Sequence, residues 1–136
     1  MIKLHHINLC SDRVPRLGTF YRDVLGLSDV PELTADRITS GYGAETAFVT
    51  DGAMQIHLST HDYELGDRLG QMVNPVDRGH VAFRTDDLDA VKRRLEAAGV
   101  AYSDYGVWGM KGWHQMFFRD PAGNVIEVHE IKDLGA

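Results

Sequence analysis

One sequence pattern occurs twice in this chain. The first copy opens with His-Ile-Asn-Leu at residues 6–9 and closes an amphipathic run at Gly26. The second opens with His-Val-Ala-Phe at residues 80–83 and closes a similar run at Gly99. The opening histidines are 74 positions apart and the closing glycines 73, so the register holds to one residue. A repeat of this kind predicts two copies of one supersecondary unit.

Hydrophobic periodicity predicts a strand, a helix and further strands in each copy. Period-two alternation indicates strands, and apolar residues three and four apart indicate helices. In the first half we expect a strand at 3–10, a helix at 13–25, an irregular stretch at 28–33, and strands at 44–50 and 53–59. In the second half we expect a strand at 80–84, a helix at 86–98, and strands at 101–105, 113–119 and 125–131. The polar segment between the copies carries only a short helix near 65–72.

These elements predict an α+β fold made of two βαβββ modules. Residues 1–60 form the first module, 61–78 a linker and 79–136 the second, within one domain. Three or four strands with one apolar face are not stable alone, so the modules must bury that face together. We expect them to pair into a cupped mixed β-sheet cleft with the helices outside.

Composition narrows the main partner to a small molecule or a protein. The net charge of −6 and the pI near 5.5 argue against nucleic acid or an anionic membrane as the main partner. Cys10 is the only cysteine, which excludes an intramolecular disulfide and fits a reducing compartment. No run approaches the length of a membrane span. We therefore expect a cytoplasmic protein with a small-molecule substrate.

Strand alternation directs several polar side chains toward the cleft. His5 is expected to face away from His6, in a structural role. Polar residues on an inward sheet face are informative because such positions are usually apolar. The inward set comprises His6, Asn8, Gln55, His57, Ser59, His80, Glu127 and His129.

The motifs resemble those of the vicinal oxygen chelate superfamily. Besides the two repeated openings, the resemblance rests on Phe-Tyr-Arg-Asp-Val-Leu-Gly-Leu at 20–27, Met-Gln-Ile-His-Leu at 54–58 and the segment 117–127, which reads Phe-Phe-Arg-Asp-Pro-Ala-Gly-Asn-Val-Ile-Glu. This group of paired βαβββ proteins includes glyoxalase I, methylmalonyl-CoA epimerase, extradiol dioxygenases, and fosfomycin and bleomycin resistance proteins. The resemblance implies the glyoxalase-like fold over nearly the whole chain.

The resemblance also implies a metal site with ligands His6, His57, His80 and Glu127. Position 57 departs from the pattern, because glyoxalase I carries a glutamate there and methylmalonyl-CoA epimerase a glutamine. Imidazoles with one carboxylate suit a divalent ion such as Zn, Ni, Co, Mn or Fe(II). Glu127 or His57 would be the catalytic proton carrier. The alternative is a metal-free polar network of the same side chains.

Other residues are predicted to contact substrate. Asn8 and Gln55 should flank the site, and Tyr105 and His114 should lie at the cleft edge. The glycine-rich loop 106–113 presents Trp108, and mobile apolar loops often cover substrates. The alternative for this loop is a subunit interface, a common place for exposed aromatic residues.

The resemblance leaves four functions to compare. The first is a metal-dependent lyase or isomerase of the glyoxalase type, which acts by metal-assisted proton transfer. The second is an extradiol-type Fe(II) dioxygenase, although the tyrosine of those enzymes would fall on Phe117 and a ligand at His57 would crowd the metal. A fosfomycin-type enzyme fits the acidic balance less well, and a non-enzymatic drug-binding protein lacks such ligands. We also expect a homodimer.

Overall fold

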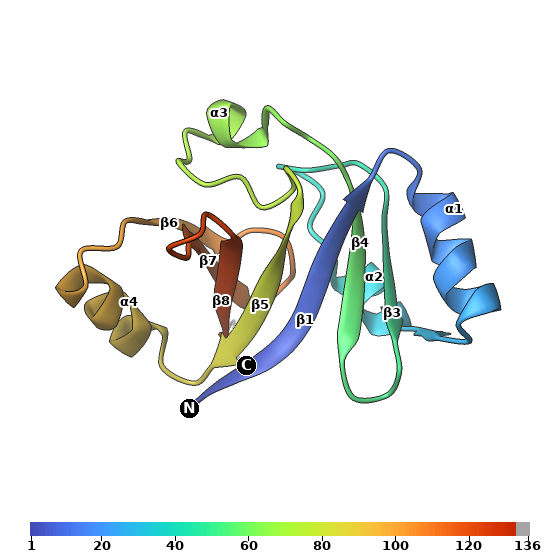
Figure 1. Ribbon diagram of the computed structural model, residues 1–136, viewed down its shortest axis with the longest axis horizontal. Helices are drawn as coiled ribbons and strands as arrows, with labels where there is room; N and C mark the ends of the chain where they lie inside the picture. The colour runs from blue at the N-terminus through green and yellow to red at the C-terminus, as the bar shows by residue number, and fades with distance from the viewer. Residues whose placement is uncertain (133–136) are drawn as a thin grey trace.

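The computed structural model describes residues 1–132. Figure 1 shows the chain as one curved sheet with a helix at each outer flank. No helix in the described part is long and apolar enough to cross a membrane. The elements in chain order are β1 (Ile2–Ser11), α1 (Val14–Thr19), the π-helical turn η1 (Phe20–Val24), β2 (Ser28–Asp29), α2 (Pro31–Asp36), β3 (Thr46–Thr50), β4 (Gln55–Thr60), α3 (Leu65–Leu69), β5 (Gly79–Thr85), α4 (Leu88–Ala97), β6 (Tyr102–Val107), β7 (Trp113–Arg119) and β8 (Val125–Ile131).

All the strands join one eight-stranded mixed sheet in the order β2-β3-β4-β1-β5-β8-β7-β6. The two halves meet at the centre, where β1 and β5 pair antiparallel (Figure 1). On either side of this pair the arrangement repeats, because β1 is parallel to β4 and β5 is parallel to β8. The expected α+β class is confirmed, with two strand-helix-strand halves in one mixed sheet. This topology brings the repeated opening strands together.

The helices stabilise the outer flanks of the sheet. Helix α4 packs its apolar side, Leu88 and Val91, against Met116 of β7 and Val128 of β8. Its first turn is capped by Asp87, whose side chain accepts a hydrogen bond from the Ala90 amide at 3.0 Å. On the other flank α1 lies against β3 and β4. These contacts leave the opposite sheet face free to form a cleft.

The first half departs from the expected elements in two places. The predicted helix at 13–25 is α-helical at first and then widens into the π-helical turn η1, where the Leu25 amide bonds to the Phe20 carbonyl five residues earlier. The stretch 28–33, expected to be irregular, contains β2 and the start of α2. Helix α2 has only six residues, begins at Pro31 and buries only Leu33, so the sequence shows no helical periodicity there.

Candidate metal centre

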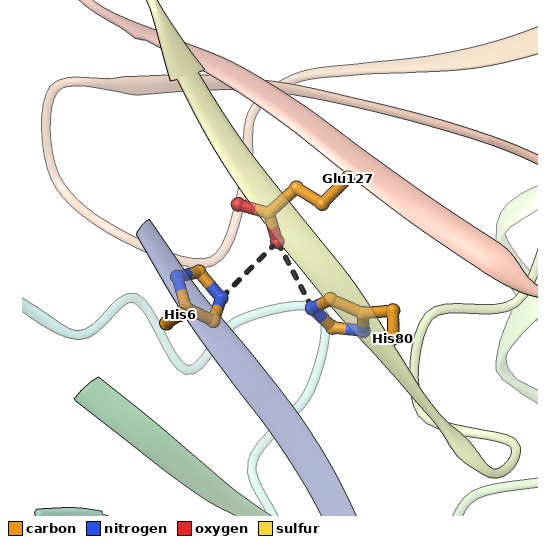
Figure 2. Close-up of side chains that lie close together, drawn as sticks. All are labelled: His6, His80 and Glu127. Atoms are coloured by element: carbon orange, nitrogen blue, oxygen red, sulfur yellow. Dashed lines mark ion pairs between the residues drawn. The ribbon is translucent and has the colours of Figure 1, made fainter. Parts of the chain in front are cut away.

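Three side chains from three neighbouring strands converge at the centre of the sheet. His6 lies on β1, His80 on β5 and Glu127 on β8, and one ligand atom from each lies within 4.8 Å of the others. Figure 2 shows both imidazoles directed at the carboxylate. His80 Nε2 lies 3.1 Å and His6 Nε2 3.7 Å from Glu127 Oε1. The strand register explains the meeting, because Ala82 is opposite both His6 and Glu127 and its small side chain leaves room between them.

Hydrogen bonds occupy the other polar atoms of these three residues. His80 Nδ1 donates to the Pro75 carbonyl at 2.8 Å. His6 Nδ1 lies 2.8 Å from His5 Nδ1, and with the proton on His6 the Nε2 atom of His6 is bare. Glu127 Oε2 accepts from His129 Nδ1 at 2.7 Å. Such outer partners fix the tautomer and orientation of metal ligands in proteins.

The remaining atoms have the character of a cation site. With its proton on Nδ1, His80 presents a lone pair to Glu127 Oε1, and two acceptors at 3.1 Å need a proton or a cation between them. Burial lowers the pKa of His6 well below its usual value, which favours the neutral, ligating form. Burial opposes ionisation of Glu127, but the neighbouring imidazoles outweigh it and hold the pKa of its carboxyl group well below its usual value. Two neutral imidazoles and one carboxylate fit a divalent metal ion.

His57, the fourth predicted ligand, lies beside this group but outside it. Its ring stacks on the His6 ring with centroids 3.6 Å apart, and Phe48 contacts it edge-on. His57 Nε2 donates to Gln55 Oε1 at 2.8 Å, which leaves Nδ1 with a lone pair. Burial lowers the pKa of His57 to about 3, so the ring is neutral at pH 7. The structure therefore groups three of the four predicted ligands, and a metal bond to His57 stays a prediction.

The expected orientation of His5 is wrong. The pairing of β1 with β5 shifts register between Leu4 and His6, so the alternation of side chains breaks at His5. His5 is half-buried beside His6, and its ring also lies edge-on to the rings of Trp113 and His129. Burial, together with the charge of Arg84, lowers the pKa of His5 to about 4. A bulge of this kind leaves no mark on a polar-apolar pattern.

A small cleft of about 60 Å³, partly open to solvent, lies over the three converging side chains. Of the predicted substrate contacts, Asn8 and Trp108 line it. Gln55 is not among the lining residues and is hydrogen-bonded to His57. Tyr105 and His114 are not among the lining residues: Tyr105 donates to the Val73 carbonyl at 2.6 Å, and His114 pairs with Asp104 at 2.7 Å.

The sequence reasoning missed Arg37, which lines the cleft. Its guanidinium donates to the Ala44 carbonyl at 2.7 Å, to Thr46 Oγ1 at 3.1 Å and to the Tyr42 carbonyl. Burial lowers the pKa of Arg37, and no carboxylate forms an ion pair with it among residues 1–132. The segment around Arg37 has no periodicity. The only sequence signal for its role is a single positive charge in a stretch rich in Gly and Thr.

The loop 106–113 closes one side of the cleft against the first half of the same chain. The Ile38 amide donates to the Gly109 carbonyl at 3.0 Å, and the Lys111 amide donates to the Asp36 carbonyl at 2.9 Å. Met110 and Trp113 are buried with Val30, Leu33 and Phe48 of the first half. Trp113 is thus covered within the chain, whereas a lid function of the loop stays a prediction.

Comparisons with known proteins give the family. Residues 3–128 match the Glyoxalase/Bleomycin resistance protein/Dioxygenase superfamily. The chain belongs to this superfamily. No curated protein sequence matches it significantly.

Solved structures of the superfamily share the fold at low identity. Methylmalonyl-CoA epimerase from Mycobacterium tuberculosis is 24% identical with a TM-score of 0.70, over 96% of this chain and 89% of that one. A Streptomyces coelicolor methylmalonyl-CoA epimerase variant bound to 2-nitronate-propionyl-CoA is 22% identical with a TM-score of 0.69, over 98% and 97%. A glyoxalase/bleomycin resistance protein/dioxygenase superfamily member from Vibrio splendidus 12B01 is 14% identical with a TM-score of 0.56, over 96% and 99%.

Proposed function

We propose that this protein is a metal-dependent isomerase that moves a proton on a small oxygenated substrate bound in the cleft. The observation that carries the proposal is the convergence of His6 Nε2, His80 Nε2 and Glu127 Oε1 on one buried point that borders the cleft. These residues would hold the ion. A divalent ion there would supply Lewis-acid stabilisation of negative charge on a substrate oxygen. The epimerases of similar fold favour an isomerase over a lyase.

The chain's own residues supply the remaining functions of such an enzyme. His57 keeps the lone pair of Nδ1 for a proton and Gln55 fixes its tautomer, but its pKa of about 3 makes it a weak base at pH 7. Glu127 is the second group able to carry a proton, through the oxygen that faces the imidazoles. Arg37 brings to the cleft wall a positive charge that no carboxylate pairs with among residues 1–132, which favours a substrate with an anionic group.

The test combines metal content with proton exchange. Chelator-stripped protein is reloaded with Zn, Ni, Co, Mn or Fe(II), and metal per chain is measured by mass spectrometry. The loaded protein is then incubated in D₂O with methylmalonyl-CoA, or with methylglyoxal and glutathione, and deuterium incorporation is followed by NMR. We expect about one metal per chain and metal-dependent exchange that Glu127→Ala abolishes. A metal content near zero with every ion would refute the proposal.

One observation favours a second candidate, an extradiol-type Fe(II) dioxygenase. Two histidines and one carboxylate form the facial triad of non-haem Fe(II) oxygenases, and the structure groups these three without His57. Against it, buried Phe117 lies edge-on to His80 at the position where extradiol dioxygenases carry a tyrosine. Oxygen uptake by the Fe(II)-loaded protein with catechols measures this activity directly, and uptake without deuterium exchange would favour the dioxygenase.

A further inference from the structure

A chain of hydrogen bonds links Arg84 through His129 to Glu127. Arg84 Nε donates to His129 Nε2 at 2.9 Å, and His129 Nδ1 donates to Glu127 Oε2 at 2.7 Å. The strand register builds this chain of hydrogen bonds, because Arg84 of β5 is directly opposite His129 of β8, and His129 is two residues beyond Glu127 on the same face. All three side chains therefore follow from the pairing of two strands.

The chemistry of arginine gives this chain of hydrogen bonds a fixed direction. A guanidinium has only donors, so His129 Nε2 must accept and its proton must be on Nδ1. That proton can reach only Glu127 Oε2, which leaves Oε1 for His6 Nε2 and His80 Nε2. Glu127 therefore directs Oε1, and not Oε2, toward the predicted metal.

Packing holds His129 in place while the charge of Arg84 acts through it. His129 is fully buried and stacks on the Trp113 ring, with centroids 4.2 Å apart and planes 15° apart. The Arg84 guanidinium lies 5.0 Å from the Trp113 ring centroid, which also restrains it. Within residues 1–132 Arg84 forms no ion pair with a carboxylate, and His129 accepts its only side-chain hydrogen bond. A charge at the far end of a hydrogen-bonded chain strengthens the bonds along it.

We propose that Arg84 and His129 are positioning residues that orient Glu127 as a one-oxygen ligand of the metal. This inference rests on the proposed metal site. Loss of an outer partner of a metal ligand typically weakens metal binding about 10- to 100-fold. We therefore expect His129→Leu, which removes both the acceptor and the donor, to raise the Kd for Co(II) about 10- to 100-fold. His129→Gln, whose amide can accept and donate, should recover part of that loss.

The interaction between the two residues is the decisive measurement. Co(II) affinity is measured by chelator competition, and the visible absorption bands of bound Co(II) report its ligand geometry. As a single substitution, Arg84→Met should weaken Co(II) binding. Added to His129→Leu, it should cause no further loss, because Arg84 acts through His129. Arg119→Met, an exposed arginine on β7, is the matched control for the loss of one positive charge.

The outcomes separate this inference from the proposed function. If wild-type protein binds no Co(II), the metal site itself fails. If wild-type protein binds Co(II) but His129→Leu leaves both the Kd and the absorption bands unchanged, the positioning role is overturned and the metal site stands. Additive effects of Arg84→Met and His129→Leu would likewise overturn it. Thermal unfolding of each variant checks that a weaker Kd does not reflect unfolded protein.

Discussion

Acid should destabilise the metal-free protein because the histidines of the centre are buried in their neutral form. Burial lowers the pKa of His57 to about 3, whereas an imidazole in the unfolded chain titrates near 6.5. Between these values the unfolded state binds a proton that the folded state does not. The free energy of unfolding therefore rises with pH across this window. The contribution of His57 is complete above about pH 6.5 and is lost progressively as the pH falls toward 3. The lowered pKa of His6 acts in the same direction.

The magnitude follows from the linkage between protonation and folding. Each such group changes the free energy of unfolding by about 1.4 kcal/mol per pH unit in the steep part of the window. His57 is almost fully buried, so its contribution needs no reduction for solvent screening. Between pH 6 and pH 4 His57 alone should remove about 2.5 kcal/mol of stability. Domains of this kind have about 5–15 kcal/mol in total, so the effect is large.

Urea unfolding in EDTA at half-unit steps from pH 7 to pH 4 measures this slope. His57→Gln should reduce it by about 1.4 kcal/mol per pH unit, whatever its effect on stability at pH 7. Ile56→Val, on the opposite face of β4, is the control and should shift the curve equally at every pH. The reasoning is refuted if wild-type stability is flat between pH 6 and pH 4.5, or if His57→Gln has the wild-type slope.

Three further predictions concern metal affinity and assembly. His80→Ala and Glu127→Ala should abolish Co(II) binding, whereas His57→Gln should weaken it less because His57 lies outside the three-residue group; equal losses in chelator competition would contradict this. Asn8→Ala should lower the free energy of unfolding by about 1–3 kcal/mol because Ser59 loses its hydrogen-bond partner. The same variant should bind Co(II) more tightly because the smaller side chain gives His57 space to approach the ion; an unchanged or larger Kd for Co(II) would contradict this. Sedimentation should give a homodimer of the 15.2 kDa chain, and a monomer at all concentrations would contradict that expectation.

The meeting of His6, His80 and Glu127 could be predicted because all three lie on regular strands. Their faces follow from alternation, and the repeat indicates that the two opening strands occupy equivalent places. His129 was predicted to face inward for the same reason. Its partner Arg84 was not singled out, since the bond between them depends on the register of β5 against β8, and alternation does not specify register between strands.

His5 and Arg37 could not be placed from the pattern, for two different physical reasons. His5 turns inward because one residue is displaced in the pairing of β1 with β5, and such a bulge depends on both strands. Arg37 is held by carbonyl groups of the irregular segment around it and by the bridge between its own backbone and Met110. Contacts between irregular backbone segments are non-local, so no local period encodes them.

Glu127 joins the three-residue group and His57 does not, and the residue opposite each of them on the neighbouring strand accounts for this difference. The two residues are equivalent in the repeat, since each lies on a strand parallel to an opening strand, opposite the second residue after its histidine. Opposite Glu127 that residue is Ala82, which is small, so the carboxylate reaches His6 across it. Opposite His57 it is Asn8, a larger residue that is also opposite His80 and whose amide donates to Ser59 Oγ at 2.8 Å. The same backbone geometry therefore admits Glu127 to the group and keeps His57 beside it.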